Sequence, residues 1–435
     1  MTRLEPRLPM FACLALAMLA GVAPANAADR VTFYDDVAPI LRANCQSCHQ
    51  PVGRNMGALV APMPLMTYEQ TRPYARAIAR KVQAREMPPW FAEAPRGVFS
   101  NERVLTDKEI QTLVAWVEAG APAGDKSHAT SAPVTTEAAT GGWSLGKPDL
   151  IVKMPKPFLV PDDAEDLQVT FYTKITDDML PQDVYVRGWE FRTGTYGPHR
   201  NTIHHMCGGV ESPEFDPNTA EVQNEDALSL GCIAGGAEPA ELPDGFGRLL
   251  KKGSTIAMGM HYYKEAGAGT GYMNEAEVGF YFAKGPVKHV VSSTAIGNLS
   301  LEIPPGAESH RVGGVTTLKN DTLIIALWPH AHLRATAARY VAVYPDGRRE
   351  LLLDVPRYDQ GWQVTYKYRE PKLLPKGTRI EVDMTYDNTN ARGAKKQFDA
   401  TRRVFYGPRT QDEMMLGFFE FAPAQPAATE TQQQQ

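Results

Sequence analysis

Three short histidine patches are the residues of this chain whose types and spacing could do chemistry. They are His204-His205 with the following Met206-Cys207, then His261, then His330-Ala331-His332. The chain has only 10 histidines in 435 residues, so this concentration is hard to explain as ordinary packing. Gathered imidazoles with a soft thioether favour copper over magnesium or calcium, and zinc is the rival metal.

The spacing within each patch sets a condition on the backbone. His330 and His332 are two residues apart, so on a strand both side chains project from one face, as two ligands of one metal must. His204 and His205 are adjacent, and a regular strand would send them to opposite faces. Their joint use therefore requires a bend, a bulge or a strand end. A lone His261 is more often a hydrogen-bonded core residue than a ligand.

A separate candidate site lies near the N-terminus. Cys45-Gln46-Ser47-Cys48-His49 has the spacing of a c-type haem attachment site, in which both cysteines form thioether links and the histidine is the proximal iron ligand. A zinc site or a redox CxxC is the alternative, but the adjacent histidine favours haem. Met87, in a loop stiffened by two prolines, is the best candidate for the sixth ligand. Its rivals are Met56, Met63 and Met66.

Helices are expected around this motif. Val37, Ile40 and Leu41 recur at helical spacing just before it. The segment 106–109 is a capping box that opens an amphipathic helix, and Gly120 follows the end of that helix. Over residues 30–124 this arrangement resembles a small monohaem cytochrome c. The resemblance implies an all-α domain carrying one covalent haem c.

The rest of the chain is predicted to be β. Residues 125–145 are rich in small and turn-forming residues and predict a linker. From 146 to 421, short alternating runs separated by Pro, Asp and Gly predict antiparallel, jelly-roll-like sandwiches. The length favours two of them, 146–285 and 286–421. Residues 422–435 predict a disordered tail.

The first 27 residues have the pattern of a secretory signal cleaved after about Ala27, which predicts an exported, periplasmic protein. No later run is apolar enough to span a membrane. The formal charge of −5 excludes a basic surface for nucleic acid. Cleavage removes Cys13 and haem would use Cys45 and Cys48. Cys207 and Cys232 then remain as an even pair, most simply a disulfide, the alternative being a thiolate metal ligand at Cys207.

The order of the histidine patches resembles that of the copper type II ascorbate-dependent monooxygenases, which include the peptidylglycine α-hydroxylating and dopamine β-monooxygenases. The resemblance covers about residues 146–421. It implies one copper for electron transfer and a second copper that activates dioxygen. The ligands of the first would be His204, His205 and His261; those of the second would be His330, His332 and Met414, the last in Asp412-Glu413-Met414. From the residues alone, Met415 and Met384 compete with Met414.

The implied reaction is hydroxylation of a C–H bond of a small organic substrate with dioxygen, at the His330/His332/Met414 site. The second electron comes from the three-histidine copper. We hypothesise that the haem replaces ascorbate and passes electrons from a periplasmic donor. Trp328, Leu416 and Phe418 stand where the amidating enzyme has polar substrate-binding residues, so the pocket is expected to be more apolar. The alternatives are a non-catalytic electron-transfer or copper-binding protein, and a binding module with structural histidines.

Overall fold

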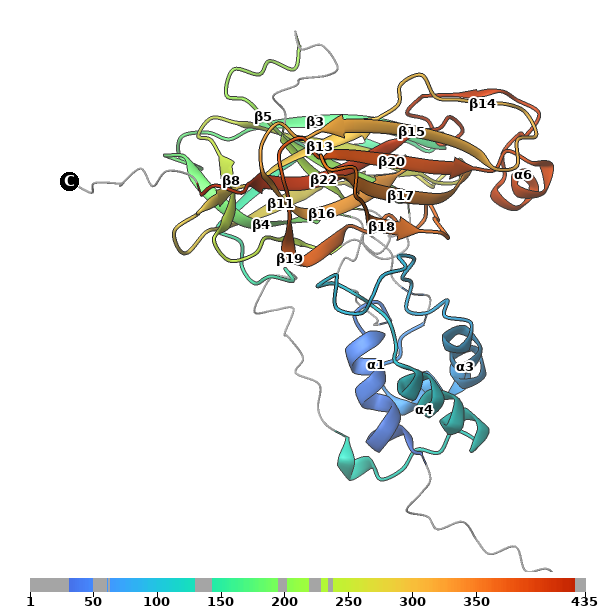
Figure 1. Cartoon of the computed structure of the whole chain (residues 1–435). Coiled ribbons are helices and arrows are strands. Elements are labelled where there is room, and N and C mark those ends of the chain that lie inside the picture. Colours follow the sequence, from blue (N-terminus) through green and yellow to red (C-terminus); the bar gives the residue numbers. More distant parts are fainter. Residues whose placement is uncertain are drawn as a thin grey trace, which may run out of the picture.

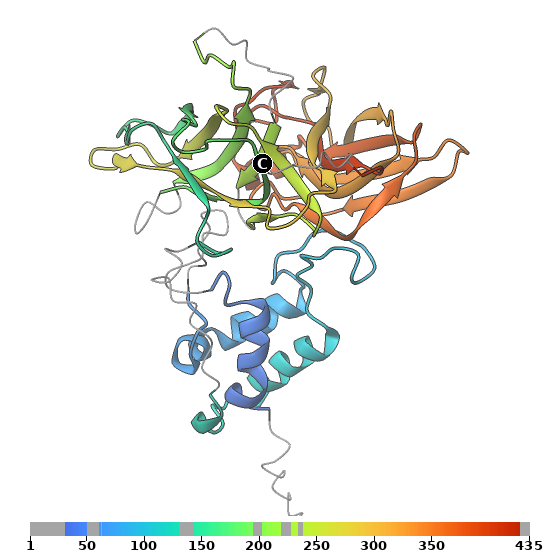
Figure 2. The same ribbon diagram turned by 90° about the vertical axis from the view of Figure 1, so that its left-hand side faces the viewer.

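The computed structural model describes most of the chain between residues 31 and 426. The described ranges are 31–49, 61, 63–129, 143–194, 202–218, 228–233 and 238–426. The predicted signal peptide, most of the predicted linker, the end of the predicted tail and Met56 lie outside them. Figures 1 and 2 show a helical unit built from the N-terminal residues below a larger β body. Among the described residues, no helix is both long and apolar enough to cross a membrane.

The N-terminal unit comprises the described residues from 31 to 129. Its elements are η2 (Phe33–Val37), α1 (Ala38–Asn44), α2 (Tyr68–Thr71), η3 (Arg72–Tyr74), α3 (Ala75–Gln83), α4 (Asp107–Glu118) and η4 (Lys126–His128). The predicted capping box is present, because the Thr106 hydroxyl accepts from the Glu109 N–H while the Glu109 carboxylate accepts from the Thr106 N–H. A small core forms around the fully buried Leu41, Leu113 and Trp116.

The prediction of an all-α cytochrome c domain over residues 30–124 is wrong. Its helices are short, at 4 to 12 residues. The long stretch between α3 and α4 is not helical and joins the β body instead. Trp90 and Phe99 are buried in the core of the second sandwich, where Phe99 forms a β-bridge with Tyr368. The prolines of this stretch interrupt a helix, and its aromatic rings are buried only by packing on strand β19 (Tyr366–Leu374).

Residues 150–290 form the first sandwich. One sheet has the order β1-β11-β4-β8-β12 with β7 beside β4, and the other has the order β3-β9-β5-β6. The strands are β1 (Leu150–Lys153), β3 (Asp166–Lys174), β4 (Val184–Arg192), β5 (Ile203–Glu211), β6 (Leu228–Ile233), β7 (Ala240–Glu241), β8 (Phe246–Leu250), β9 (Thr255–Tyr263), β11 (Glu277–Phe282) and β12 (His289–Val290), with β2 (Phe158–Val160) and β10 (Tyr272–Asn274) as a separate pair. Since β12 pairs with β8, this sandwich extends a few residues past the predicted boundary at 285.

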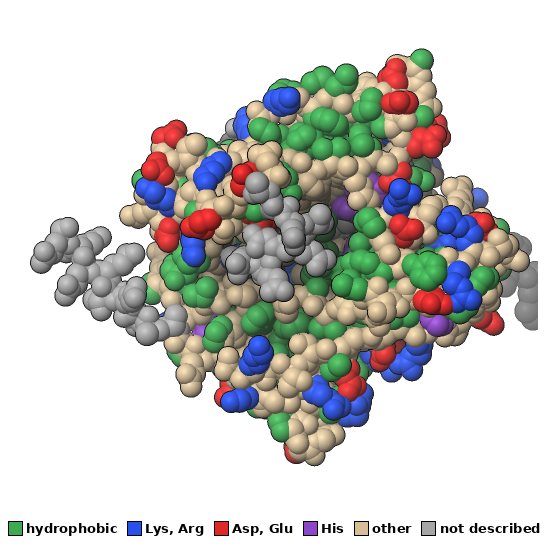
Figure 3. All heavy atoms as spheres, turned by 90° about the horizontal axis from the view of Figure 1, so that it is seen from above, with side chains coloured by type: hydrophobic (Ala, Val, Ile, Leu, Met, Phe, Trp, Pro, Cys, Tyr) green, Lys and Arg blue, Asp and Glu red, His purple; other side chains and the backbone are tan. Residues whose placement is uncertain are grey.

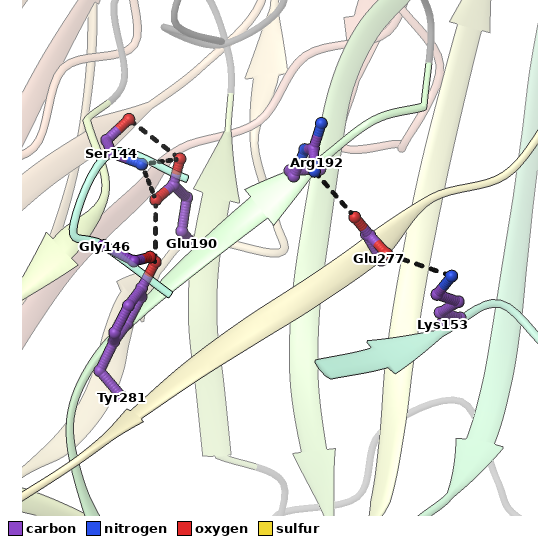
Figure 4. A network of polar contacts seen from close by, with 7 residues as sticks. All are labelled: Ser144, Gly146, Lys153, Glu190, Arg192, Glu277 and Tyr281. Atoms are coloured by element: carbon purple, nitrogen blue, oxygen red, sulfur yellow. Dashed lines mark hydrogen bonds and ion pairs between the residues drawn. The ribbon is translucent and has the colours of Figure 1, made fainter. Parts of the chain in front are cut away.

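The two sheets of the first sandwich pack tightly face to face. A Cβ atom at Gly208 in β5 would come within 2.4 Å of the Phe191 ring in β4. Only a glycine lets the sheets approach so closely at this point. Ser144, near the end of the predicted linker, and Gly146, just after it, are hydrogen-bonded to the sheet that contains β4. Glu190 accepts hydrogen bonds from the Ser144 N–H and hydroxyl, and Tyr281 donates to the Gly146 carbonyl at 3.0 Å (Figure 4).

Residues 292–423 form the second sandwich. Its sheets have the orders β13-β22-β16-β19 and β15-β20-β17-β18. The elements are β13 (Ser292–Gly297), β14 (Glu302–Ile303), β15 (His310–Thr317), β16 (Thr322–His330), β17 (Ala335–Val343), β18 (Arg349–Val355), β19 (Tyr366–Leu374), β20 (Arg379–Tyr386), α6 (Asn390–Lys396), β21 (Val404–Phe405) and β22 (Leu416–Pro423), with β14 and β21 as a separate pair.

The two sandwiches share a packed interface. Ile325 of β16 and Ala422 of β22 lie in the hydrophobic core of the first sandwich. Arg248 of β8 is 1% exposed and forms an ion pair with Glu420 of β22 at 3.5 Å. The strands that carry the histidine patches, β5 and β9 on one side and β16 on the other, are therefore held by the same buried interface.

Candidate metal centre

The first two histidine patches meet across one pair of strands. β5 and β9 are antiparallel neighbours, and the register shifts between Ile203, which faces Tyr262, and His205, which faces His261. His204 is the extra residue of this bulge. The irregularity that the sequence requires for joint use of His204 and His205 is thus present. Candidate ligand atoms of His204, His205 and His261 all lie within 4.8 Å of one another.

The nitrogen atoms of this cluster indicate what it can hold. The Nδ1 atoms of His205 and His261 are buried and, within the described part of the chain, have no hydrogen-bond partner. Buried polar nitrogens without a partner are rare and need an explanation. The other ring nitrogen of His261, Nε2, lies 2.6 Å from the Asp166 carboxylate. A carboxylate behind one ring nitrogen with the other left free is the usual environment of a metal-binding histidine, so the residues fit a metal ion.

Removing the Asp166 carboxylate should weaken metal binding at this cluster. In Asp166→Ala, His261 loses the acceptor that fixes its tautomer and ring orientation. We expect the affinity for Zn(II) or Cu(II) to fall by about 10–100-fold. Glu165→Ala is the matched control, since it removes an exposed carboxylate one residue away. Equal affinities of the two variants in a competitive chelator titration would contradict this role of Asp166.

The third patch lies at the end of β16, and its hydrogen bonds also indicate which ring nitrogen carries the proton. The Nδ1 of His330 lies 2.6 Å from the Gln363 side-chain oxygen, and the Nδ1 of His332 lies 3.1 Å from the Asp412 carbonyl. Both acceptors require a proton on Nδ1, so each Nε2 keeps a free lone pair for a metal. The two rings are 5.3 Å apart and perpendicular.

Burial distinguishes the three methionines that compete as thioether ligand. Met384 and Met415 are fully buried in the core of the second sandwich. Met414 is only partly buried and follows the segment tied to His332. A thioether packed into a hydrophobic core is not free to reach a metal. Met414 is thus the one of the three that is not fully buried, and its role as a metal ligand stays a prediction.

Glu413 holds the His330/His332 patch and the Met414 segment together, a role that the sequence analysis missed. Its fully buried carboxylate accepts hydrogen bonds from the backbone N–H groups of His332 at 2.8 Å, Arg334 at 2.6 Å and Met414 at 3.3 Å. Burial raises the pKa of Glu413 to about 7, against the opposing effect of these hydrogen bonds. The sequence showed the Asp-Glu pair before Met414 only as a motif.

The two histidine groups lie close enough to affect each other electrostatically. Burial is the main cause that lowers the pKa of His204 to about 4 and that of His332 to about 3, and neighbouring imidazoles add to it. The pKa of His205 is also lowered, first by burial and then by four histidines that include His330 and His332. Figure 3 shows histidine side chains inside a hollow of the β body, on the side away from the N-terminal unit. The lowered pKa values favour neutral imidazoles at His204, His205 and His332, as metal ligands must be.

The metal-free protein should lose stability as the pH falls below neutrality. The pKa of His204 and of His332 is near 6.5 in the unfolded chain but about 4 and about 3 in the fold. Between these values the unfolded chain binds more protons, so stability falls at roughly 1.4 kcal/mol per pH unit for each such histidine. The raised pKa of Glu413 acts in the opposite direction between 4.5 and about 7, but it is one group against several. Chemical denaturation of chelator-treated protein at pH 7 and pH 5 measures the free energy of unfolding at each pH. If the difference between the two pH values were the same in a His204→Gln, His332→Gln double variant, the prediction would be contradicted.

Cys207 and Cys232 form a disulfide bond between β5 and β6, where they face each other in register. The bond excludes the alternative in which Cys207 is a thiolate ligand beside His205. It also ties β6 to the strand that carries His204 and His205.

The haem motif follows α1 directly. Cys45 and Cys48 are free thiols, and burial raises the pKa of Cys45 to about 12. The Nδ1 of His49 lies 3.0 Å from the Met63 carbonyl, which requires a proton on Nδ1 and leaves Nε2 free for iron. The residues therefore fit a proximal haem ligand. Since Met63 serves the proximal histidine with its carbonyl, it is a poor candidate for the opposite face. Met87 is 37% exposed in the stretch between α3 and α4.

A cavity of ≈ 100 Å³ lies between the two sandwiches, and none of the patch histidines is among the described residues that line it. Trp328 and Phe418 line it and stack at 4.3 Å, and the Trp328 ring is 6.4 Å from the His330 ring. The charged groups at its rim are mostly paired, as in Glu238 with Arg103. The wall nearest the patch is thus aromatic; Leu416 lies beside His330 in the β22 register.

Comparisons with known proteins add no functional information. Neither a protein-family model nor a curated protein sequence matches the chain. Among solved structures, the chain is similar to the major capsid protein P2 from bacteriophage PM2, at 7% identity over 65% of this chain and 99% of that chain, with a TM-score of 0.26. It is also similar to the cowpea mosaic virus top component, at 5% identity over 63% and 90% of the two chains, with a TM-score of 0.30. At such TM-scores these similarities say nothing about the site.

Proposed function

We propose that the protein is an exported copper-dependent monooxygenase that hydroxylates a C–H bond of a small, largely apolar organic substrate. The observation that carries the proposal is the pair of buried, partnerless Nδ1 atoms of His205 and His261 in a three-histidine cluster. The His330/His332 patch, with both Nε2 atoms free, lies close to that cluster. Two adjacent sets of imidazoles, one with the partly buried Met414 as its thioether candidate, suit two copper ions.

The chain's own residues have distinct roles in this proposal. Copper bound at His330, His332 and Met414 would supply activation of dioxygen, and copper at the three-histidine cluster would supply the second electron. Gln363 and the Asp412 carbonyl keep the protons of His330 and His332 on Nδ1, which directs both Nε2 atoms to the metal. The stacked rings of Trp328 and Phe418 would favour an apolar substrate over a carboxylate.

One haem c, which Cys45, Cys48, His49 and Met87 would hold, would replace ascorbate as the source of electrons from a periplasmic donor. The N-terminal unit packs on β19, and β19 pairs with β16, the strand that ends at His330. The hollow that contains histidines opens on the opposite side. A substrate that enters through this hollow would therefore approach from the side away from the N-terminal unit.

Metal analysis and isotope labelling test the proposal on the full chain. We expect about two copper ions and one iron per chain. With a reductant and ¹⁸O-labelled dioxygen, small apolar compounds should gain one labelled oxygen atom. Copper and iron at these ratios without oxygen incorporation would make the protein an electron-transfer or copper-binding protein. No copper bound at all would leave the histidines with a structural role only.

A further inference from the structure

Two glutamines form a hydrogen-bonded bridge between the histidine groups. Gln363 accepts from the Nδ1–H of His330 at 2.6 Å and donates through Nε2 to the Gln360 carbonyl at 3.2 Å. The side-chain nitrogen of Gln360 lies 3.3 Å from Nε2 of His204. A continuous polar path thus runs from the third histidine patch to the three-histidine cluster on the other sandwich.

The bridge is buried and is connected to the third histidine patch. Gln360 and Gln363 are 8% and 3% exposed, in the loop between β18 and β19. Tyr358, in the same loop, exchanges hydrogen bonds with both the carbonyl and the N–H of Ala331, the residue between His330 and His332. The loop is therefore attached directly to the patch that its glutamines contact. In a buried polar network connected in this way, the position of each member depends on its neighbours.

The two glutamine side chains differ in how far their amide orientation is determined. At His330 the assignment is determined, because Gln363 must offer its oxygen to the Nδ1 proton while its amide donates to the Gln360 carbonyl. At His204 two nitrogens face each other, so one of the two side chains must present an acceptor. If Nδ1 of His204 binds a metal, Nε2 carries the proton and Gln360 accepts it after its amide is turned over. Metal binding at His204 therefore sets the orientation of Gln360.

We propose that Gln360 and Gln363 are positioning residues that couple the two histidine groups, so that a metal at one group raises the metal affinity of the other. Metal at His330 orders Gln363 and, through the Gln360 backbone, the loop that presents Gln360 to His204. The loop has then already lost conformational entropy when the first metal binds, so the second metal binds more tightly. The inference rests on the metal ligands of the proposed function but not on its oxygen chemistry.

A binding cycle with Zn(II) tests the coupling. His332→Ala and His261→Ala give the single-site constants of the two groups, and the parent protein gives the overall two-metal constant. The coupling factor is the overall constant divided by the product of the single-site constants. Replacing Gln363 or Gln360 by Ala in all three proteins should lower this factor by about 5-fold or more, at the low end of known site–site couplings. Gln411→Ala is the control. It removes the hydrogen bond from the Gln411 side-chain amide to the Gln397 carbonyl and should leave the coupling factor unchanged.

Two further measurements separate coupling from a general loss of structure. The EPR spectrum of Cu(II) at the three-histidine cluster should change when Zn(II) fills the other group, and this response should disappear in Gln360→Ala. Gln363→Glu should retain the His330 interaction but lose coupling, because it keeps the acceptor and lacks the amide donor to Gln360. A coupling factor equal in the parent and in both glutamine variants would overturn the proposal, whether or not the protein oxygenates substrate. Coupling without oxygen incorporation would instead reject only the monooxygenase function.

Discussion

Met414→Leu is expected to abolish oxygenation while leaving the fold and the haem in place. Leu has nearly the volume of Met, so packing changes little. What disappears is the thioether sulfur, the soft ligand proposed beside His330 and His332. We expect one copper to bind more weakly and the rate of oxygen incorporation to fall by about 100-fold or more, which corresponds to about 2.7 kcal/mol of transition-state stabilisation. Copper stoichiometry and kcat/KM with labelled dioxygen measure both effects.

The neighbouring methionine provides the matched control. Met415→Leu makes the same chemical change one residue away, but Met415 is fully buried in the core of the second sandwich. Such a swap should cost less than about 1.5 kcal/mol of stability and leave copper binding unchanged. If Met415→Leu lost activity and Met414→Leu did not, the assignment of the thioether would be reversed. Wild-type activity in both would remove methionine from the site altogether.

The sequence predicted those parts of the site that depend on local spacing. The irregularity demanded by His204-His205 follows from strand periodicity, and β5 has the bulge where it was needed. The strand expected to carry both His330 and His332 ends at His330, so His332 lies just beyond it. The choice of nitrogen at each ring could not be predicted. It depends on acceptors such as Asp166 and Gln363, which are brought beside His261 and His330 by strand pairing and by a loop from distant positions.

The N-terminal unit shows where a local motif misleads about the fold. The capping box of α4 and the helix before Cys45 were predicted correctly because both are short-range patterns. The closed all-α domain was inferred from the assembly of such patterns. It fails because Trp90 and Phe99 bury their rings on Tyr366 and Tyr368 of β19, about 270 residues further along the chain. Nothing in the spacing of the two aromatics indicates a distant sheet as their partner.

Glu413→Ala is expected to produce the largest loss of stability of any substitution near the site. It leaves the buried N–H groups of His332, Arg334 and Met414 without their acceptor, at roughly 1–3 kcal/mol for each stranded group. It also removes the carboxylate that faces the buried Arg334 guanidinium. The sum is a large part of the roughly 5–15 kcal/mol that typically stabilises a protein. Urea denaturation of the metal-free protein measures it.

Two comparison variants distinguish the loss of the hydrogen bonds that Glu413 accepts from a simple loss of charge. Glu413→Gln keeps one oxygen that can accept a hydrogen bond, so its loss of stability should lie between those of wild type and Glu413→Ala. Glu381→Ala removes a carboxylate of β20, in the same sandwich, that pairs with Arg349 and Arg379 at the surface, which should cost at most about 1 kcal/mol. If Glu413→Ala were no more destabilised than Glu381→Ala, the three N–H groups would have other acceptors. His332 and Met414 would then be held together by something other than this carboxylate.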